Sequence, residues 1–402
     1  MYENNFRDRF CIVGLGVTKV GHLPGSTSQR LEIEAARIAI EDAGLAPQDI
    51  DAAIQAESDT GSGVRPRYAD AFPRMLGLPV KVYIPSVGRG GEVAMMSILS
   101  ATQLLSLGIA KYVLIAGARD DWSRGQKVRA QQGGVRGRPF MEKEGAWGRP
   151  YGHLTAASIH GFFATRHMHE HGTTSRQFGA VAVAERQWAC LNPHAYMHGR
   201  PITIEDHQSS PIVVWPYHLL DICLRSDGGT AFIVTTAERA KNLKKPPVYL
   251  MGIGFGEQMA KLWWDKTSYT TVAVETAKRD AFRMAGIELK DIDVAEFYDC
   301  FTPEVVFQLE DYGWCKKGEG GPFVEEGHIG PGGDLPVNTG GGLLSSHHLD
   351  NLTCVSEAII QMRGEGGNRQ VKDAEIALAT GHGGEIVPGQ MCSIHSTLIL
   401  RR

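Results

Sequence analysis

The chain has 402 residues, 43% of them apolar, and a formal net charge of −4. That length suffices for two or three domains with a sizeable core, and the mixed, slightly acidic charge excludes a general nucleic-acid binder, which would present a strongly basic face. The seven cysteines are scattered without a Cys-x-x-Cys pair, which indicates neither a disulfide framework nor a structural zinc site. Because the chain has neither a run of ~20 apolar residues nor a signal peptide, we expect a soluble, cytoplasmic protein.

Short apolar runs alternate with segments of helical periodicity along the chain. Residues 10–14 and 111–117 are apolar and bounded by glycine, as strands are, while residues 30–43 and 91–108 carry the helical pattern. The alternation predicts an α/β fold. Residues 119–152 differ, because arginines, lysines and glycines replace the aliphatic residues, and we interpret this segment as a loop.

An internal repeat divides the chain. The phrase AGLAPQDIDAAI at 43–54 returns as AGIELKDIDVAE at 285–296, and in both a helix ends at glycine before an apolar strand begins. A weaker echo pairs KYVLIAG at 111–117 with EIALATG at 375–381. One such match is open to chance, but two in the same order predict two similar halves.

Three further phrases carry a resemblance to a known family. They are HGTTSRQFGAVAVAERQWACLNPHA at 171–195, EFYDCFTPE at 296–304 and NTGGGLLSSHHLDN at 338–351. Together with the repeat they resemble the thiolase superfamily, in particular its sterol-carrier-protein type. The resemblance implies the thiolase fold, with duplicated βαβ halves in a layered α/β/α/β/α arrangement and an inserted loop domain.

The same resemblance implies domain boundaries and an oligomeric state. The N-terminal half is expected at 1–119 plus 220–245, the loop domain at 120–219 and the C-terminal half at 246–402. A homodimer is expected as well.

The first half lacks the nucleophile that ordinary thiolases use. Alignment of SVGRGGEVAMM at 86–96 places Val87 where the family carries its reactive cysteine, and no cysteine lies between Cys11 and Cys190. A side chain without a heteroatom cannot hold an acyl group, so an acyl-enzyme at Val87 is excluded. Gly90 is expected either to admit a ligand or only to let a helix start pack tightly.

In the second half a tyrosine takes the place of the family's Asn or His. Tyr298 stands at that position in the phrase Tyr-Asp-Cys-Phe, which resembles the thiolase-like aldolases of steroid side-chain degradation. A phenol serves as a hydrogen-bond donor, or as a base if its surroundings lower its pKa. The alternative is a buried tyrosine whose hydroxyl is bonded to backbone.

Two histidines and two glycines complete the expected site. His348 aligns with the catalytic histidine of the family and Asn338 with the start of its motif, although the aldolases that the chain resembles carry tyrosine at the His348 position. His382 is a second candidate acid or base, or else a histidine on a surface turn. The backbone N–H groups of Gly383 and Gly384 are candidate oxyanion donors.

These residues predict a lyase that cleaves a β-hydroxyacyl-CoA by a retro-aldol reaction. Tyr298 is the expected base, and His348 is expected to stabilise or protonate the enolate, with supporting polarity from Asn338. Two alternatives stay open: a non-catalytic acyl-CoA-binding scaffold, and an acyltransferase that uses another thiol such as Cys223 or Cys300.

The sequence also indicates ligands and partners. Coenzyme A is expected only as part of the substrate, and its phosphates are one candidate ligand of the basic segment 119–152, a protein contact being the other. No separate cofactor or metal is expected, and His167 and His171 are interpreted as a solvated helix end. The resemblance further implies a small partner subunit with a zinc ribbon and an OB-type fold.

Overall fold

A computed structural model describes residues 6–56, 71–85, 90–132, 155–260, 270–271, 273–383 and 391–402. Within them nine strands form one mixed sheet in the order β3-β2-β4-β7-β1-β8-β11-β10-β9. These strands are β1 (Phe10–Val17), β2 (Ala52–Gln55), β3 (Val82–Pro85), β4 (Val113–Asp120), β7 (Asp227–Thr236), β8 (Val248–Ala260), β9 (Val294–Glu296), β10 (Ile376–Gly383) and β11 (Met391–Arg401). A separate hairpin pairs β5 (Ile212–Val214) with β6 (Tyr217–His218).

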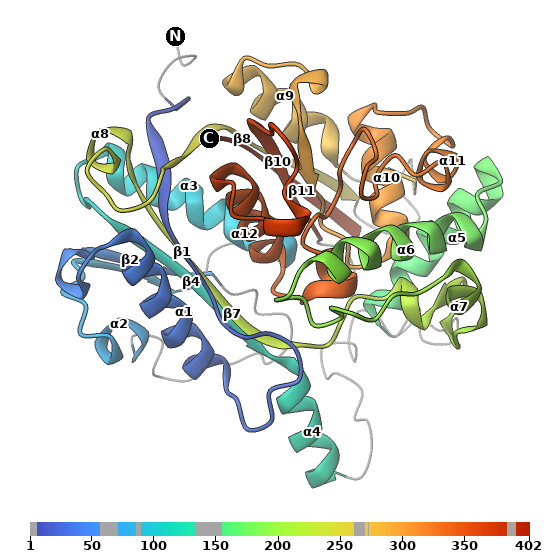
Figure 1. Ribbon diagram of the computed structural model, residues 1–402, viewed down its shortest axis with the longest axis horizontal. Helices are drawn as coiled ribbons and strands as arrows, with labels where there is room; N and C mark the ends of the chain where they lie inside the picture. Colours follow the sequence, from blue (N-terminus) through green and yellow to red (C-terminus); the bar gives the residue numbers. More distant parts are fainter. Residues whose placement is uncertain are drawn as a thin grey trace.

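Helices pack on both faces of the sheet. They are α1 (Ser28–Ala43), α2 (Ala71–Met75), α3 (Val93–Ser106), α4 (Asp121–Gln132), α5 (Ala156–His171), α6 (Ser175–Leu191), α7 (Ile204–Ser209), α8 (Ala237–Ala240), α9 (Val274–Ala285), α10 (Thr302–Tyr312), α11 (Gly320–Glu325) and α12 (Asn351–Arg363). Helices α3 and α12 contact each other between the two halves of the sheet, while α1 and α9 lie on its outer faces (Figure 1). The layered α/β fold expected from the sequence is confirmed.

The internal repeat is confirmed down to single hydrogen bonds. Helices α1 and α9 end at Gly44 and Gly286, both in the left-handed region, and each is followed by a 3₁₀ turn and a short strand. The Asp51 carboxylate accepts hydrogen bonds from two successive backbone N–H groups just before β4, and the Asp293 carboxylate does the same where β10 begins. The two phrases are therefore one structural unit used twice.

Glycines let the outer helices approach the sheet closely. A Cβ atom at Gly16 of β1 would lie 2.0 Å from the Ala35 carbonyl oxygen of α1, and one at Gly254 of β8 would lie 2.0 Å from the Ala277 carbonyl oxygen of α9. Any side chain would collide with the helix backbone. The small residues on both partners therefore set the same helix-to-sheet distance in each half.

The expectation of a loop from residue 119 onward is wrong for its first part. Residues 119–120 complete strand β4 and residues 121–132 form helix α4. Arg119, near the end of β4, pairs with Asp350, which is 231 residues away, and a local reading does not detect that partner. Residues 133–154 lie outside the described residues.

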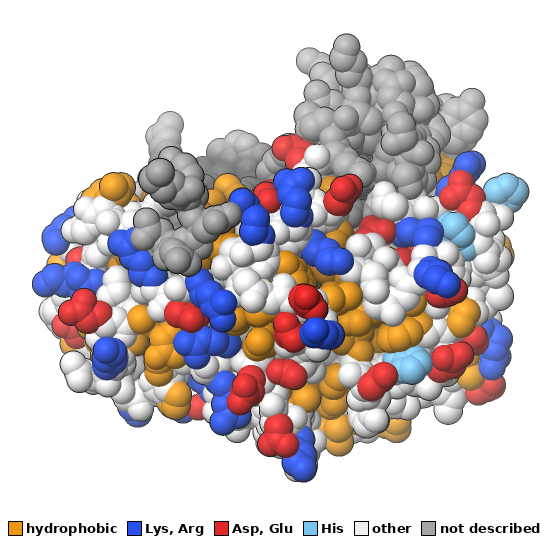
Figure 2. All heavy atoms as spheres, turned by 90° about the horizontal axis from the view of Figure 1, so that it is seen from above, with side chains coloured by type: hydrophobic (Ala, Val, Ile, Leu, Met, Phe, Trp, Pro, Cys, Tyr) orange, Lys and Arg blue, Asp and Glu red, His pale blue; other side chains and the backbone are white. Residues whose placement is uncertain are grey.

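The expected domains correspond to groups of elements, although their boundaries stay a prediction. Helices α5 to α7 and the β5–β6 hairpin belong to the expected loop domain, 120–219. No described helix is long and apolar enough to cross a membrane. On the face drawn in Figure 2, acidic and basic side chains are intermixed, which agrees with the near-neutral net charge.

Candidate active site

Tyr298 lies in the loop between β9 and α10, and both polar groups of its backbone are hydrogen-bonded to side chains. Its N–H donates to Thr380 Oγ1 (2.9 Å), and its carbonyl accepts from Gln308 Nε2 (2.9 Å). The side chain is buried, and no described residue forms a hydrogen bond with its hydroxyl. Burial, followed by the nearby Asp350 carboxylate, raises the pKa of Tyr298 well above its usual value, so the phenol keeps its proton at neutral pH.

His348 faces Tyr298 across a short gap. The two rings are 6.4 Å apart, edge to face, and the His348 backbone N–H donates to Ser226 Oγ at 2.9 Å. Burial first and the Arg119 guanidinium second lower the pKa of His348 to about 4, which leaves the imidazole neutral at pH 7. Its Nε2 is buried and has no hydrogen-bond partner among the described residues. Among the described residues, the hydrogen-bonding capacity of the phenol and of this nitrogen is therefore unused.

A buried ion pair joins the two halves beside this gap. Arg119, at the end of β4, donates from Nη2 to both carboxylate oxygens of Asp350 (2.8 and 2.6 Å). Asp350 has φ 50° and ψ −147°, a region that belongs essentially to glycine. Its Oδ1 lies 3.8 Å from His348 Nε2. Arg119 is therefore committed to a protein carboxylate, while the expectation that segment 119–152 binds coenzyme A phosphates or a protein stays a prediction.

A cluster of buried carboxyl groups connects the Tyr298 loop to the glycine-rich turn before His348. Asp299 accepts backbone N–H groups of Leu343 and Leu344 at 2.8 and 3.0 Å. Burial and the Asp299 carboxylate raise the pKa of the adjacent Glu185 well above its usual value, so Glu185 carries the proton between the two acids. Asp299 thus fixes the spacing of the segments that carry Tyr298 and His348.

Asn338 belongs to this bracing. Its Oδ1 accepts the Phe297 N–H (2.6 Å), its Nδ2 donates to Glu185 Oε1 (2.7 Å), and its φ of 52° is left-handed. Both ends of the amide are used within the protein. The structure therefore places Asn338 as a positioning residue for the end of β9, and a direct role in the reaction stays a prediction.

Cys223 brings a thiol into contact with His348. Its Sγ lies 3.5 Å from His348 Nδ1. Burial, with the Asp299 carboxylate next, raises the pKa of Cys223 to about 12, so the thiol stays protonated. Cys300 is buried too, and its carbonyl accepts the Cys223 N–H at 3.0 Å. A protonated thiol is a poor nucleophile.

The two glycine segments expected at the site meet. A Cβ atom on Gly383, at the end of β10, would lie 3.1 Å from Gly91 N and 3.5 Å from the Cα of Gly90. The first-half glycine turn and the C-terminal one are therefore adjacent, as an oxyanion site built from both would require. Val87 and Gly384 lie outside the described residues, so their roles stay predictions.

His382 is buried rather than on a surface turn. It lies within β10, and its backbone carbonyl is so close to Gly91 that a Cβ there would approach within 2.1 Å. The His382 Nε2 lies 3.2 Å from Glu304 Oε2 on α10. Its use as an acid or base in the reaction stays a prediction.

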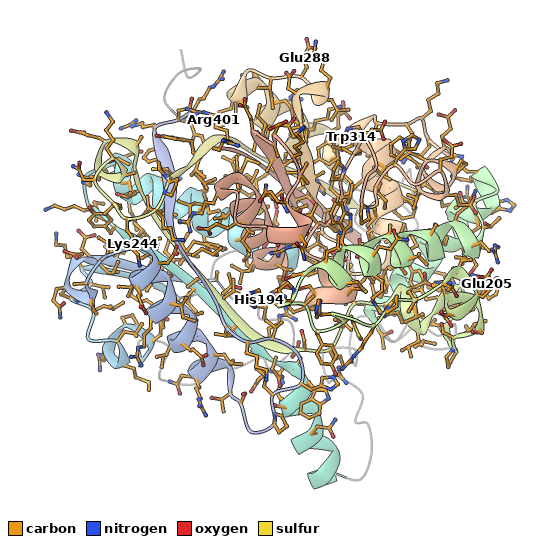
Figure 3. The ribbon with its side chains drawn as sticks, viewed as in Figure 1. His194, Glu205, Lys244, Glu288, Trp314 and Arg401 are labelled. Carbon is orange, nitrogen blue, oxygen red and sulfur yellow. The ribbon has the colours of Figure 1, made fainter. Side chains whose placement is uncertain are left out.

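A cavity of about 510 Å³ opens on the other side of the glycine-rich turn. It reaches Asn338 and His347 but neither Tyr298 nor His348. His194, which also borders it, lies near the centre of the molecule after α6 (Figure 3). The cavity is therefore separate from the Tyr298–His348 gap.

The sequence reading missed Arg119, Asp350 and Cys223 as members of the site. A charged residue that ends an otherwise apolar strand was the available signal for Arg119, and proximity to His348 was the signal for Asp350. Cys223 appeared only as one of several thiols. Nothing local in the sequence shows that it touches His348, 125 residues away.

Comparisons with known proteins identify the family. The family described as "Thiolase C-terminal domain-like" matches residues 258–402. A steroid side-chain-cleaving aldolase of Thermomonospora curvata is 34% identical over 376 residues, covering 92% of this chain and 95% of that protein. The chain belongs to the thiolase superfamily. A second relative, the 17-hydroxy-3-oxo-4-pregnene-20-carboxyl-CoA lyase of Mycobacterium tuberculosis, is 32% identical and covers 92% of this chain and 96% of its own.

The fold of this thiolase-superfamily chain has a close solved counterpart. The Ltp2-ChsH2(DUF35) aldolase superposes with a TM-score of 0.85 at 32% identity, covering 99% of this chain and 98% of that one. The resemblance stated from the sequence motifs is therefore confirmed, both in the family and in the subgroup of thiolase-like aldolases.

Proposed function

We propose that this thiolase-like aldolase cleaves a β-hydroxyacyl-CoA, of the steroid side-chain class, to a ketone or aldehyde and a shorter acyl-CoA. The observation that carries the proposal is the pairing of a protonated phenol and a neutral imidazole, whose ring centroids lie 6.4 Å apart, while the Cys223 thiol beside them stays protonated. A retro-aldol reaction requires one donor and one acceptor of this kind. The named activities of the two relatives support the substrate class.

We assign the proton-accepting role to His348. Its neutral ring is able to take the proton of the β-hydroxyl, and the imidazolium that forms lies 3.8 Å from the Asp350 carboxylate. The Cα–Cβ bond then breaks, and its electron pair moves into the thioester as an enolate. The proton returns from the imidazolium to the α-carbon, which completes the balance.

Tyr298 then serves as the enolate donor. A phenol whose pKa is raised keeps its proton and donates it in a hydrogen bond to the developing enolate oxygen. This division is the reverse of the one expected from the sequence, in which Tyr298 was the base. The opposite pKa shifts of the two groups favour it.

The acyltransferase alternative fits the site less well. It requires a thiolate, whereas burial raises the pKa of Cys223 to about 12, and the flanking carboxylates oppose a further negative charge. The scaffold alternative leaves unexplained why a strained Asp350 is maintained beside His348. We therefore keep the lyase as the proposal.

The deciding experiment is a panel of β-hydroxyacyl-CoA thioesters, with release of shorter acyl-CoA followed by mass spectrometry. Wild-type protein should release it, and Cys223→Ala should retain at least about a tenth of that activity, while His348→Gln should lose about 10²- to 10⁴-fold. Alkylation is a poor substitute, because a group added to Cys223 Sγ would crowd the ring 3.5 Å away. Loss of all activity in Cys223→Ala, with accumulation of acyl-enzyme in wild type, would establish the acyltransferase instead.

The pH dependence of kcat/KM distinguishes His348 as the base from Tyr298 as the base. If His348 is the base, kcat/KM should form a plateau from about pH 5 to pH 9, falling on the acid side near its pKa of about 4. If Tyr298 is the base, kcat/KM should rise about tenfold per pH unit across that same range. The second profile would reverse our assignment while leaving the lyase activity intact.

Partners complete the proposal. A structural neighbour assembled with a second component, the Ltp2-ChsH2(DUF35) aldolase, supports a small partner subunit here, and coenzyme A enters as part of the substrate. We further propose that the chain forms a homodimer and acts in the cytoplasm. Co-purification with small proteins encoded beside it, followed by sizing of the complex, tests the assembly.

A further inference from the structure

A second cluster of ionisable side chains is buried away from the Tyr298–His348 gap. His160 on α5, Glu304 on α10 and His382 on β10 each place one nitrogen or carboxylate oxygen within 4.8 Å of the others. His160 Nδ1 lies 2.5 Å from Glu304 Oε1, and His382 Nε2 lies 3.2 Å from Glu304 Oε2. All three side chains are at most 4% exposed.

A comparison on the same helix shows what this cluster lacks. Glu310, about two turns further along α10, also contacts a buried histidine, His167, at 2.9 Å. Glu310 has in addition the Lys317 ammonium at 3.1 Å and the backbone N–H groups of Gly318 and Gly320. Its charge is thus balanced within the protein, and the expectation that His167 belongs to a solvated helix end is wrong, because it is fully buried.

Glu304 has no such cation among the residues that the structure describes. Its ion-pair partners there are the two histidines, and neither carboxylate oxygen accepts a backbone N–H from a described residue. A carboxylate in a low-dielectric interior is costly without a positive partner. A divalent cation would supply that charge.

A second, independent observation points to a ligand at this place. The Tyr217 hydroxyl is fully buried and has no hydrogen-bond partner in the described part of the chain. Glu304 is the charged group that acts most strongly on it. The Tyr217 ring stacks on Phe301 at 5.0 Å, and Phe301 in turn contacts the His160 ring at 4.8 Å. An unsatisfied buried hydroxyl is rare and calls for a missing polar partner.

We propose that His160, Glu304 and His382 bind a divalent cation of the zinc class. Two imidazoles and one carboxylate are a donor set that Zn²⁺ uses in sites that keep a fourth position for water. A water in that position is the polar partner that the Tyr217 hydroxyl lacks. The ion would tie α5 of the expected loop domain to α10 and β10 of the second half.

Binding of the cation should depend on pH. An imidazole binds a cation through an unprotonated ring nitrogen, so protons compete with the metal for both histidines. Affinity should therefore fall as the pH is lowered. The site does not depend on the aldolase proposal, because its test measures binding rather than turnover.

The experiment uses the full-length chain after treatment with a chelator, titrated with Zn²⁺ by calorimetry. We expect one equivalent to bind, and Glu304→Gln and His382→Gln each to weaken binding at least about 100-fold. His167→Gln is the matched control, since it alters the other buried histidine–glutamate pair on α10, and it should bind Zn²⁺ as the wild type does.

Cobalt substitution of the wild type keeps the test valid if a variant fails to fold. Co²⁺ should give the visible absorption of a nitrogen- and oxygen-ligated site without thiolate charge-transfer absorption. Failure to retain an equivalent of Zn²⁺, equal binding by wild type and Glu304→Gln, or a thiolate band from one of the cysteines would each overturn the proposal.

Discussion

The two halves of the molecule share a helix, a 3₁₀ turn and a strand, but they differ in the residues placed after the strand. Asp51 and Asp293 make equivalent hydrogen bonds to the next strand in each half. After β9 in the second half comes Tyr298, and His348 joins it from the same half. The first half contributes Arg119, which pairs with Asp350. Duplication thus supplied the scaffold twice, while the reacting groups are concentrated in one copy.

The largest expected effect contrasts one position from each half. Tyr298→Phe should lower kcat/KM for the cleaved thioester by about 10²- to 10³-fold, because the enolate loses a preorganised donor. Val87→Ala, at the aligned nucleophile position of the first half, should change it by less than about tenfold. Steady-state kinetics on folded, purified variants measure both, and comparable losses would mean that the first half also takes part in the chemistry.

The contact between the halves should matter most for stability. Arg119→Met leaves the Asp350 carboxylate buried without its cation, and we expect a loss of about 3–5 kcal/mol in the free energy of unfolding. Asp350→Gly removes that charge and also relieves the backbone at φ 50°. The double variant should therefore be more stable than Arg119→Met alone in urea denaturation. Additive losses would show that the pair is not coupled.

The histidines beside the gap should make stability depend on pH. Burial lowers the pKa of His347 and of His348 to about 4, below the ordinary 6.5, so the unfolded chain binds more protons between those values. Each contribution is complete above pH 6.5 and is lost as the pH falls toward 4, by about 3 kcal/mol at most.

The measurement compares urea midpoints at pH 7.5 and pH 5.0. His348→Gln should lose less stability on acidification than the wild type, whereas the exposed His169→Gln should behave as the wild type does. The difference between the pH-dependent changes of the variant and the wild type cancels the contribution of carboxyl groups that titrate in the same range. An unchanged slope in His348→Gln would contradict the buried, neutral imidazole.

The smallest effect tests the equivalence of the halves. Asp51→Ala and Asp293→Ala each remove an acceptor for two backbone N–H groups, and each should cost about 1–2 kcal/mol of stability. Activity per folded molecule should stay within about threefold for Asp51→Ala. Costs that differ by more than about 1 kcal/mol would show that the two copies no longer serve the same purpose.

The sequence by itself determined the α/β fold, the two halves and the positions of Tyr298 and His348. The hydrophobic periodicity of helices and strands is a local property of the sequence. The helix ends at Gly44 and Gly286 belong to a repeated phrase that can be recognised in the sequence. The absence of a thiol at Val87 follows from the sequence too, because the family motif can be aligned along the chain.

Only the tertiary structure decided how these residues are surrounded. Arg119 meets Asp350 across 231 residues, and His160 meets Glu304 across 144, so no local pattern marks either contact. The end of β4 was read as a loop because charged residues and glycines replace aliphatic residues there, and the partner of Arg119 is distant in sequence. The pKa shifts that assign Tyr298 as donor and His348 as acceptor arise from burial and from those distant charges. Both are properties of the packed molecule, which a local stretch of sequence does not contain.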